Sequence, residues 1–145
     1  TPDNLYLANA GDSRIYLSRR GSLEQLSRDH TAAWGQWKRG EIPEVQYRSH
    51  PRRAALYEVI GGGHPAVCPY FAAIPCEPGD RFLICSDGLV DGLWDRRIEE
   101  LLLETRSGDP EANHAQALVN EAVEASGRDN TTAVVIDIAA PATSV

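Results

Sequence analysis

The chain has 145 residues, 42% of them hydrophobic, which suits one globular domain or a large part of one and excludes a disordered segment. Its net charge of −7 argues against a nucleic-acid binder or a ligand of anionic membranes, since both need clustered Lys and Arg. No apolar run reaches the ~18 residues of a membrane span, and three cysteines without C-x-x-C spacing favour a reduced, cytoplasmic protein over a disulfide framework or a zinc site.

The first part of the chain alternates between strand and turn patterns. A turn at residues 11–12 separates strands expected over 5–10 and 13–18, and a turn at 20–21 leads to a short third strand over 23–26. We predict that these three strands form a meander.

The next segment predicts a surface excursion. Helices are expected over 31–39 and 41–47, and neither carries a strong apolar stripe. Pro51 ends this region, because the residue before a proline is pushed away from helical conformation. The flap-like excursion therefore spans about 31–54, and the glycines at 61–63 form a flexible break after it.

Two strands and a turn follow the glycines. Strands are expected over 66–74 and 81–85, joined by a turn at 77–80 in which Pro78 fixes one φ and Gly79 takes a positive one. The apolar run 81–85 is typical of a strand that is buried on both faces.

The last part of the chain predicts helices and one closing strand. One helix is expected over 95–104 with Asp95 as its N-cap, and another from Asp109-Pro110 to Gly127. A β-branched strand covers 131–138, and residues 141–145 read as a tail.

Four aspartates lie where an expected strand begins or ends. Asp12 lies in the first turn, Asp87 and Asp91 follow the buried strand, and Asp129 precedes the last strand. Carboxylates at strand ends can converge at one edge of a sheet, and oxygen ligands suit hard divalent ions such as Mg²⁺ and Mn²⁺. The spacing of Asp87 and Asp91 places both on one side of a helical turn.

The structural alternative applies to every aspartate in the chain, because Asp in a turn or at an N-cap commonly bonds only to nearby backbone N–H groups. The sequence gives no further argument for a functional role for six of them, which we assign to that structural role: Asp3, Asp29, Asp80, Asp95, Asp109 and Asp137.

Three motifs distinguish the four candidates, and they carry a resemblance. Residues Ala8–Arg14 (ANAGDSR) and Arg28–His30 (RDH) resemble consecutive segments of the PPM (PP2C-like) metal-dependent protein serine/threonine phosphatases. Residues Cys85–Asp91 (CSDGLVD) and Gly127–Thr132 (GRDNTT) are similar to later segments of the same family, in the same order. His50–Arg53 (HPRR) is similar to the segment that follows the flap in bacterial members.

The resemblance implies an α/β (α+β) fold, part of a PP2C-like α-β-β-α sandwich with antiparallel sheets. It implies two or three Mn²⁺ or Mg²⁺ ions whose bound water attacks the phosphorus of phosphoserine or phosphothreonine directly. Carried onto this chain, Asp87 and Asp129 ligate an ion of the dinuclear pair, and Asp12 and Asp91 hold a further, weaker ion, with Asp87 shared between the two. Gly88 lets the backbone turn sharply beside the ions, and Asn130 supports the last loop.

The chain departs from the family pattern in one respect. The segment that supplies a phosphate-binding Arg and a DGHGG motif is not found, and Arg14 is expected to be structural. Residues 1–140 are therefore expected to be the C-terminal portion of one PPM domain in a longer protein, which the start at Thr1 without Met also predicts, and no side chain beyond the metal ligands is expected to be catalytic. This segment alone is expected to be inactive.

The expected partner of the whole protein is a phosphoserine or phosphothreonine protein in a Ser/Thr kinase pathway. Two alternatives stay open. A non-catalytic PP2C-like regulatory or binding module would be marked by loss of the ligand aspartates. A fragment that pairs with another chain would leave sheet edges and apolar surface exposed.

Overall fold

The computed structural model describes residues 4–61, 63, 66–103 and 113–139. Its elements follow in chain order: β1 (Asn4–Asn9), β2 (Arg14–Arg19), β3 (Ser22–Gln25), α1 (Ala32–Lys38), α2 (Glu44–Arg48), β4 (Tyr70–Pro75), β5 (Arg81–Cys85), α3 (Asp87–Gly92), α4 (Asp95–Leu103), α5 (His114–Ala125) and β6 (Ala133–Asp137). The expected helix start at Asp109-Pro110 and the tail at 141–145 lie outside the described residues.

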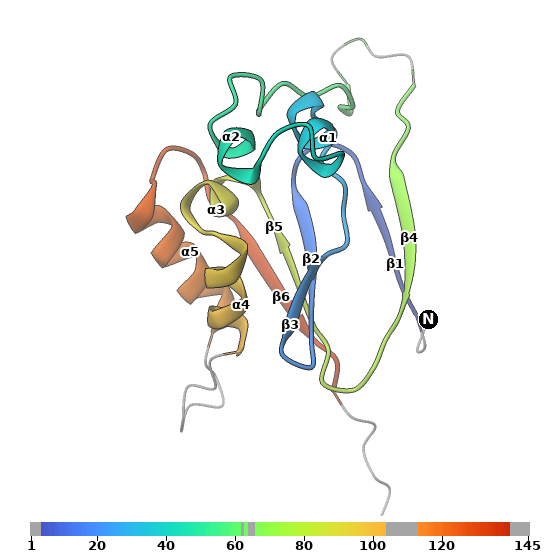
Figure 1. Ribbon diagram of the computed structural model, residues 1–145. Coiled ribbons are helices and arrows are strands. Elements are labelled where there is room, and N and C mark those ends of the chain that lie inside the picture. The colour runs from blue at the N-terminus through green and yellow to red at the C-terminus, as the bar shows by residue number, and fades with distance from the viewer. Residues whose placement is uncertain (1–3, 62, 64–65, 104–112, 140–145) are drawn as a thin grey trace, which may run out of the picture.

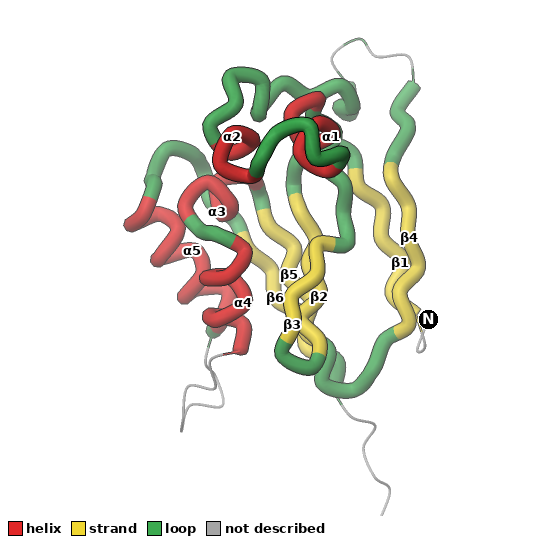
Figure 2. Tube along the Cα trace, viewed as in Figure 1, coloured by secondary structure: helices red, strands yellow, loops and turns green. Residues whose placement is uncertain are grey.

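The strands form two antiparallel sheets that face each other (Figure 1). One sheet has the order β3-β2-β5-β6, and the other pairs β1 with β4. Helices α3, α4 and α5 cover one face of the four-stranded sheet, the β1–β4 pair lies against its other face, and α1 and α2 lie across one end (Figure 2). The described layers are thus helix, sheet, sheet.

Two apolar clusters fill the spaces between these layers. Leu83 and Leu118 belong to the cluster between the helices and the four-stranded sheet, and Leu17 and Phe82 belong to the cluster between the two sheets. Side chains alternate between the two faces of a strand, so neighbours in β5 reach different clusters. The expectation that β5 is buried on both faces is confirmed for Phe82 and Leu83, whereas Ile84 is 40% exposed.

The predicted meander is wrong in its first step. Strand β1 pairs with β4 in one sheet, whereas β2 pairs with β3 and β5 in the other. Leu7 of β1 and Leu17 of β2 meet in the core between the sheets, so the two strands pack face to face across the sandwich rather than edge to edge. The β2–β3 hairpin is as predicted, and its turn residues Arg20 and Gly21 have φ values of 52° and 80°.

Helices α1, α2 and α4 agree with the predicted ranges within three residues. Helix α5 begins at His114, after its N-cap Asn113, inside the range expected for one helix from 109 to 127, and α3 is a separate helix where the sequence predicts only a helical turn. One predicted cap also differs. Helix α1 begins after Thr31, whose side chain accepts a hydrogen bond from Trp34 N, and Gly40 beyond its end has φ 73°. Helix α4 begins at Asp95, but Asp95 is not its N-cap, because the amides of the first turn donate to the Trp94 carbonyl. None of the helices in the described part of the chain combines the length and apolar character that crossing a bilayer requires.

The predicted turn at 77–80 is present and is held by a buried carboxylate. Asp80 accepts hydrogen bonds from Arg19 Nε at 2.7 Å, from Arg19 Nη2 at 2.7 Å and from the Glu77 amide at 2.7 Å, and its side chain is 1% exposed. The hydrogen bonds from Arg19 lower the Asp80 pKa below its ordinary value, against the opposing effect of burial. Gly79 in the same turn has φ 89°, as predicted.

We expect Asp80→Asn to lower the free energy of unfolding by about 1 kcal/mol at neutral pH, allowing for the partly exposed Arg19. Because the folded pKa of Asp80 is lower than the unfolded one, the stabilisation is present above the unfolded pKa and is lost as the pH falls through the folded pKa. Urea unfolding of both proteins at neutral pH and near pH 2 should therefore show a difference that closes in acid. A difference of equal size at both pH values would contradict the assignment.

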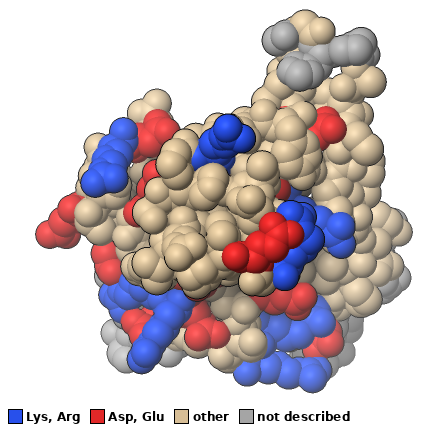
Figure 3. Space-filling model, turned by 45° about the horizontal axis from the view of Figure 1, so that its top comes forward, with Lys and Arg blue, Asp and Glu red and all other residues tan. Residues whose placement is uncertain are grey.

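Acidic and basic side chains are interspersed on the face of the molecule shown in Figure 3. Several of them form ion pairs that join elements, such as Arg97 of α4 with Glu121 of α5, at 2.6 Å between Nε and Oε1. Large apolar side chains are also exposed: Tyr6 of β1 and Phe71 of β4 are 67% and 68% exposed. The outward face of the β1–β4 pair thus carries exposed apolar side chains.

Candidate functional site

Asp12 lies in the short connection that carries the chain from β1 in one sheet to β2 in the other. His30 holds the backbone of this connection on both sides: its Nδ1 accepts a hydrogen bond from Gly11 N at 3.1 Å, and its own N–H donates to Gly11 O at 2.9 Å. Gly11 has φ 112°, a conformation that favours glycine. The backbone beside Asp12 is therefore fixed by the buried His30 rather than by a hairpin partner.

Asp87 and Asp91 lie one turn apart on helix α3, which begins directly after β5. The loop before β6 is attached to the start of this helix by Ser86. Its Oγ donates to Asn130 O at 3.2 Å and accepts from Thr132 N at 3.0 Å, and its amide donates to Thr132 O at 3.1 Å. This attachment places the loop that contains Asp129 beside the start of the helix that contains Asp87.

Gly88 is needed for close packing rather than for a sharp turn. It lies inside α3 with helical backbone, and an added Cβ would lie 2.5 Å from Asn130 O. Any larger residue at this position would push the 129–132 loop away from α3. The backbone carbonyl of Asn130 accepts the Ser86 hydrogen bond, and the role of its side chain stays a prediction.

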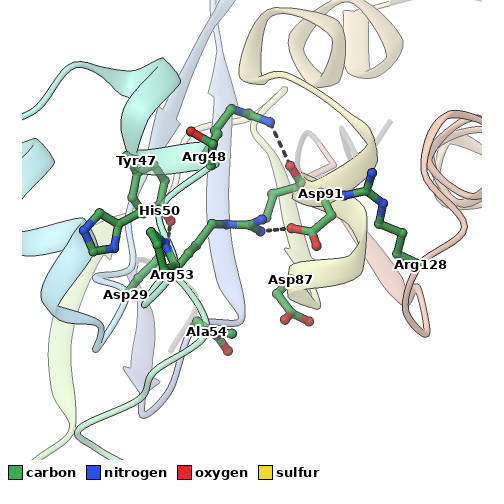
Figure 4. Close-up of a pocket in the computed structure, with 13 residues that line it drawn as sticks. Asp29, Tyr47, Arg48, His50, Arg53, Ala54, Asp87, Asp91 and Arg128 are labelled. Atoms are coloured by element: carbon green, nitrogen blue, oxygen red, sulfur yellow. Dashed lines mark hydrogen bonds and ion pairs between the residues drawn. The ribbon is translucent and has the colours of Figure 1, made fainter.

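A pocket of about 400 Å³ brings three of the four candidate aspartates together. Asp12, Asp87 and Asp91 line it, and Figure 4 shows Asp87 and Asp91 on the same side of the cavity. Asp129 does not line it: it is exposed, and its Oδ1 accepts a hydrogen bond from Asn130 N at 2.7 Å. Other side chains that line the pocket are Asp29, Tyr47, Arg48, His50, Arg53 and Arg128.

The carboxylates in this pocket disfavour one another's charge. Burial raises the pKa of Asp12 above its ordinary value, and the nearby charge of Asp87 raises it further. A divalent cation would relieve this repulsion, and carboxylate oxygens are the ligands that Mn²⁺ and Mg²⁺ prefer. However, no three His, Cys, Asp or Glu side chains lie close enough to hold a metal ion within residues 4–61, 63, 66–103 and 113–139. Asp12, Asp87 and Asp91 therefore supply suitable ligand atoms for a metal ion, but the described residues do not form a complete site.

A buried polar network supports the other side of the pocket. Arg14 and Asp29 are 3% and 2% exposed, and they form an ion pair at 2.7 Å between Nη2 and Oδ2. Tyr47 of helix α2 donates its hydroxyl to Asp29 Oδ2 at 2.8 Å. The expectation that Arg14 is structural is confirmed, and the network ties helix α2 to the four-stranded sheet.

Comparison with known proteins agrees with this arrangement. The family model described as protein phosphatase 2C matches residues 1–35. The serine/threonine protein phosphatase PstP of Mycobacterium tuberculosis is 35% identical over 136 residues, which is 94% of this chain and 25% of PstP. The crystal structure of the PPM Ser-Thr phosphatase MsPP from Mycobacterium smegmatis superposes with a TM-score of 0.78 at 40% identity, and covers 92% of this chain and 55% of MsPP.

A crystal structure of the PstP catalytic domain in complex with two manganese ions also superposes, with a TM-score of 0.76 at 34% identity over 95% of this chain and 55% of that one. The chain belongs to the bacterial PPM (PP2C-like) phosphatase family. It spans a quarter of the length of PstP and about half of each solved chain. The PPM fold explains the antiparallel sheets that pack face to face with helices on the outer side.

Three residues of this PPM chain have roles that sequence reasoning missed. The sequence assigns Asp29 only to a structural role and gives no role to His30 or Arg53. The Arg28–His30 motif is a usable indication for the first two, because it is a matched segment between two candidate aspartates. Nothing in the sequence indicated that Arg53 contacts Asp91, a contact that depends on tertiary structure.

Burial makes Cys85 of this PPM chain unsuitable as a nucleophile. Cys85 is 2% exposed, and burial raises the pKa of its thiol to about 12. A thiol with this pKa carries almost no thiolate near neutral pH, so Cys85 is a core residue. Ser86 is committed to the hydrogen bonds that hold the 129–132 loop.

Proposed function

We propose that the full-length protein is a metal-dependent protein serine/threonine phosphatase. Asp12, Asp87, Asp91 and Asp129 would supply carboxylate ligands for Mn²⁺ or Mg²⁺, with Gly88 and Asn130 fixing the loops that carry them. The observation that carries the proposal is the convergence of Asp12, Asp87 and Asp91 on one pocket in a PPM fold. The two manganese ions in the related PstP structure support the choice of metal.

The chain's own residues would orient the site in two ways. Helix α3 holds Asp87 and Asp91 on one side, and His30 fixes the connection that carries Asp12 on the other. Divalent cations bound there would neutralise negative charge on the phosphoryl oxygens and lower the pKa of a bound water. The side chain of Arg128 lines the same pocket from the loop before β6, where it adds positive charge beside the carboxylates.

The substrate would be a phosphorylated serine or threonine in a protein, as the names of the related enzymes state for them. Such an enzyme acts opposite a Ser/Thr kinase, so we propose a place in a kinase signalling pathway. The alternative is a PP2C-like regulatory module that binds partners without hydrolysis.

Mn²⁺-dependent release of phosphate from a phosphothreonine peptide tests the proposal on the full-length protein. We expect activity that EDTA abolishes and that Asp87→Asn reduces to the level of the EDTA control. Asp137→Asn is the matched control, because it removes the same charge from an exposed ion pair with Arg81 on β5. If the full-length protein releases no phosphate in the presence of Mn²⁺, the proposal fails and the regulatory module takes its place.

A further inference from the structure

A closed turn directly after helix α2 presents Arg53 to the pocket. Arg53 N donates to His50 O at 3.0 Å, Arg52 N donates to His50 Nδ1 at 3.1 Å, and Ala55 N donates to Arg52 O at 3.1 Å. These bonds are local to residues 50–55, so a contact between the Arg53 side chain and another element can stabilise the turn further.

The Arg53 side chain crosses the pocket and ends on Asp91 of helix α3, as Figure 4 shows. Its Nη2 forms an ion pair with Asp91 Oδ1, and the two side chains are 22% and 24% exposed. Asp91 Oδ1 is itself buried and accepts no hydrogen bond of regular geometry from the described part of the chain. The Arg53 charge is therefore what balances this oxygen.

Arg53 lines the same pocket as Asp12 and Asp87, so its positive charge lies among the three candidate carboxylates of one cavity. One guanidinium there offsets negative charge that a divalent cation would otherwise neutralise.

The neighbouring Arg48 makes a different kind of contact with the same helix. Its guanidinium donates to Val90 O at 2.9 Å and to Leu93 O at 3.2 Å, and it stacks over Trp94 at 3.9 Å from the ring centroid. These acceptors are backbone carbonyls outside the candidate ligand set. Arg48 can therefore stay attached to α3 while Arg53 leaves Asp91.

We propose that Arg53 is an internal counter-ion that competes with a divalent cation for Asp91. The inference rests on the proposed role of Asp91 as a metal ligand. A cation on Asp91 displaces the guanidinium and releases the 50–55 turn from α3. Conversely, the ion pair between Arg53 and Asp91 weakens binding of the cation by the same factor, because coupling between two equilibria is reciprocal. Metal occupancy and attachment of the 50–55 turn are thereby linked.

Titration of Mn²⁺ into the full-length protein by calorimetry tests the competition. We expect the more weakly bound Mn²⁺ ion to have a dissociation constant about two- to five-fold lower in Arg53→Gln than in Arg52→Gln. This factor corresponds to the free energy of a partly exposed ion pair. Arg52→Gln is the matched control, because it makes the same charge change at an exposed neighbour on the same turn. Equal affinities in the two variants, or weaker binding in Arg53→Gln, would overturn the competition.

Hydrogen exchange gives a second readout that does not depend on activity. In EDTA, the amides of residues 50–55 should exchange faster in Arg53→Gln than in Arg52→Gln, and Mn²⁺ should raise exchange there in the unsubstituted protein. Asp91→Asn separates the two hypotheses. If it leaves all Mn²⁺ binding unchanged, Asp91 is not a ligand, and both its proposed role and the competition fail; if it removes the weaker site while Arg53→Gln matches Arg52→Gln, the competition alone fails.

Discussion

Asp29→Ala is expected to lower the free energy of unfolding by about 3–5 kcal/mol, or to abolish the cooperative transition altogether. The reason is the partner that the substitution leaves behind. Arg14 is 3% exposed, and both Nε and Nη2 donate to the Asp29 carboxylate, at distances between 2.7 and 3.1 Å. Removal of that carboxylate leaves a buried guanidinium charge without its counter-charge.

Arg14 has no way to escape this cost by losing its proton. The guanidinium of arginine keeps its proton in proteins, because its ordinary pKa lies far above neutral pH. The remaining hydrogen-bond partners are the hydroxyls of Tyr16 and Tyr47, at 2.9 and 2.6 Å, which are neutral. They can accept hydrogen bonds from Arg14 but cannot neutralise it. The other carboxylate, Asp95, is more distant, at 3.9 Å between Oδ1 and Arg14 Nη1, and its side chain is 39% exposed.

Urea unfolding followed by tryptophan fluorescence measures the effect. Glu41→Ala is the matched control, because it also removes one carboxylate from an arginine, in the exposed pair Arg39–Glu41 with side chains 63% and 49% exposed. We expect no change in the urea midpoint for the control. A loss below 1 kcal/mol for Asp29→Ala would show that the network does not stabilise the fold.

Gly92→Ala is expected to cost about 1–3 kcal/mol or more by forcing helices α3 and α5 apart. An added Cβ at Gly92 would lie 2.7 Å from Ala122 Cα and 2.8 Å from Ala122 C, with the Ala122 carbonyl oxygen closer still. All three are backbone atoms of α5, so no side-chain rotation can relieve the overlap. Because α3 carries Asp87 and Asp91, the displacement should also reduce the proposed activity.

Gly35→Ala provides the control for this prediction. It makes the same substitution inside helix α1, where the new Cβ would approach only Arg39 Nη1, at 3.1 Å. The end of a flexible arginine can move, and alanine favours the helix, so we expect unchanged or slightly higher stability. Thermal unfolding of the two variants should separate them clearly, and similar melting temperatures would contradict the steric argument.

Local features of the fold could be predicted from the sequence because they depend on neighbouring residues. The hairpin turn at Arg20-Gly21, the Pro78-Gly79 turn and the helix that starts after Thr31 all follow from backbone preferences. The pairing of β1 with β4 could not be predicted in this way. A four-residue connection fits a hairpin as well as a crossover, and the choice is made by Leu7 and Leu17 in a shared core.

In the candidate site too, local motifs could be predicted from the sequence and tertiary contacts could not. Motif order identified Asp12, Asp87 and Asp91, which meet in one pocket, whereas Asp129 is exposed and directed to its own loop. The surroundings of these residues were not predictable. The Arg14–Asp29 pair joins residues 15 positions apart, and Arg53 reaches Asp91 across the pocket. Such contacts depend on how whole elements pack, and no local pattern encodes them.

The crossover between β1 and β2 has a mechanical consequence. Asp12 lies on the connection between β1 in one sheet and β2 in the other, whereas Asp87 follows β5, which is hydrogen-bonded within the four-stranded sheet alone. A shear of one sheet across the other would therefore change the separation of these two carboxylates directly. A protein segment that packs against the outer face of β1 and β4 would restrict such a shear. It would thereby affect the separation of Asp12 and Asp87 without contacting the pocket.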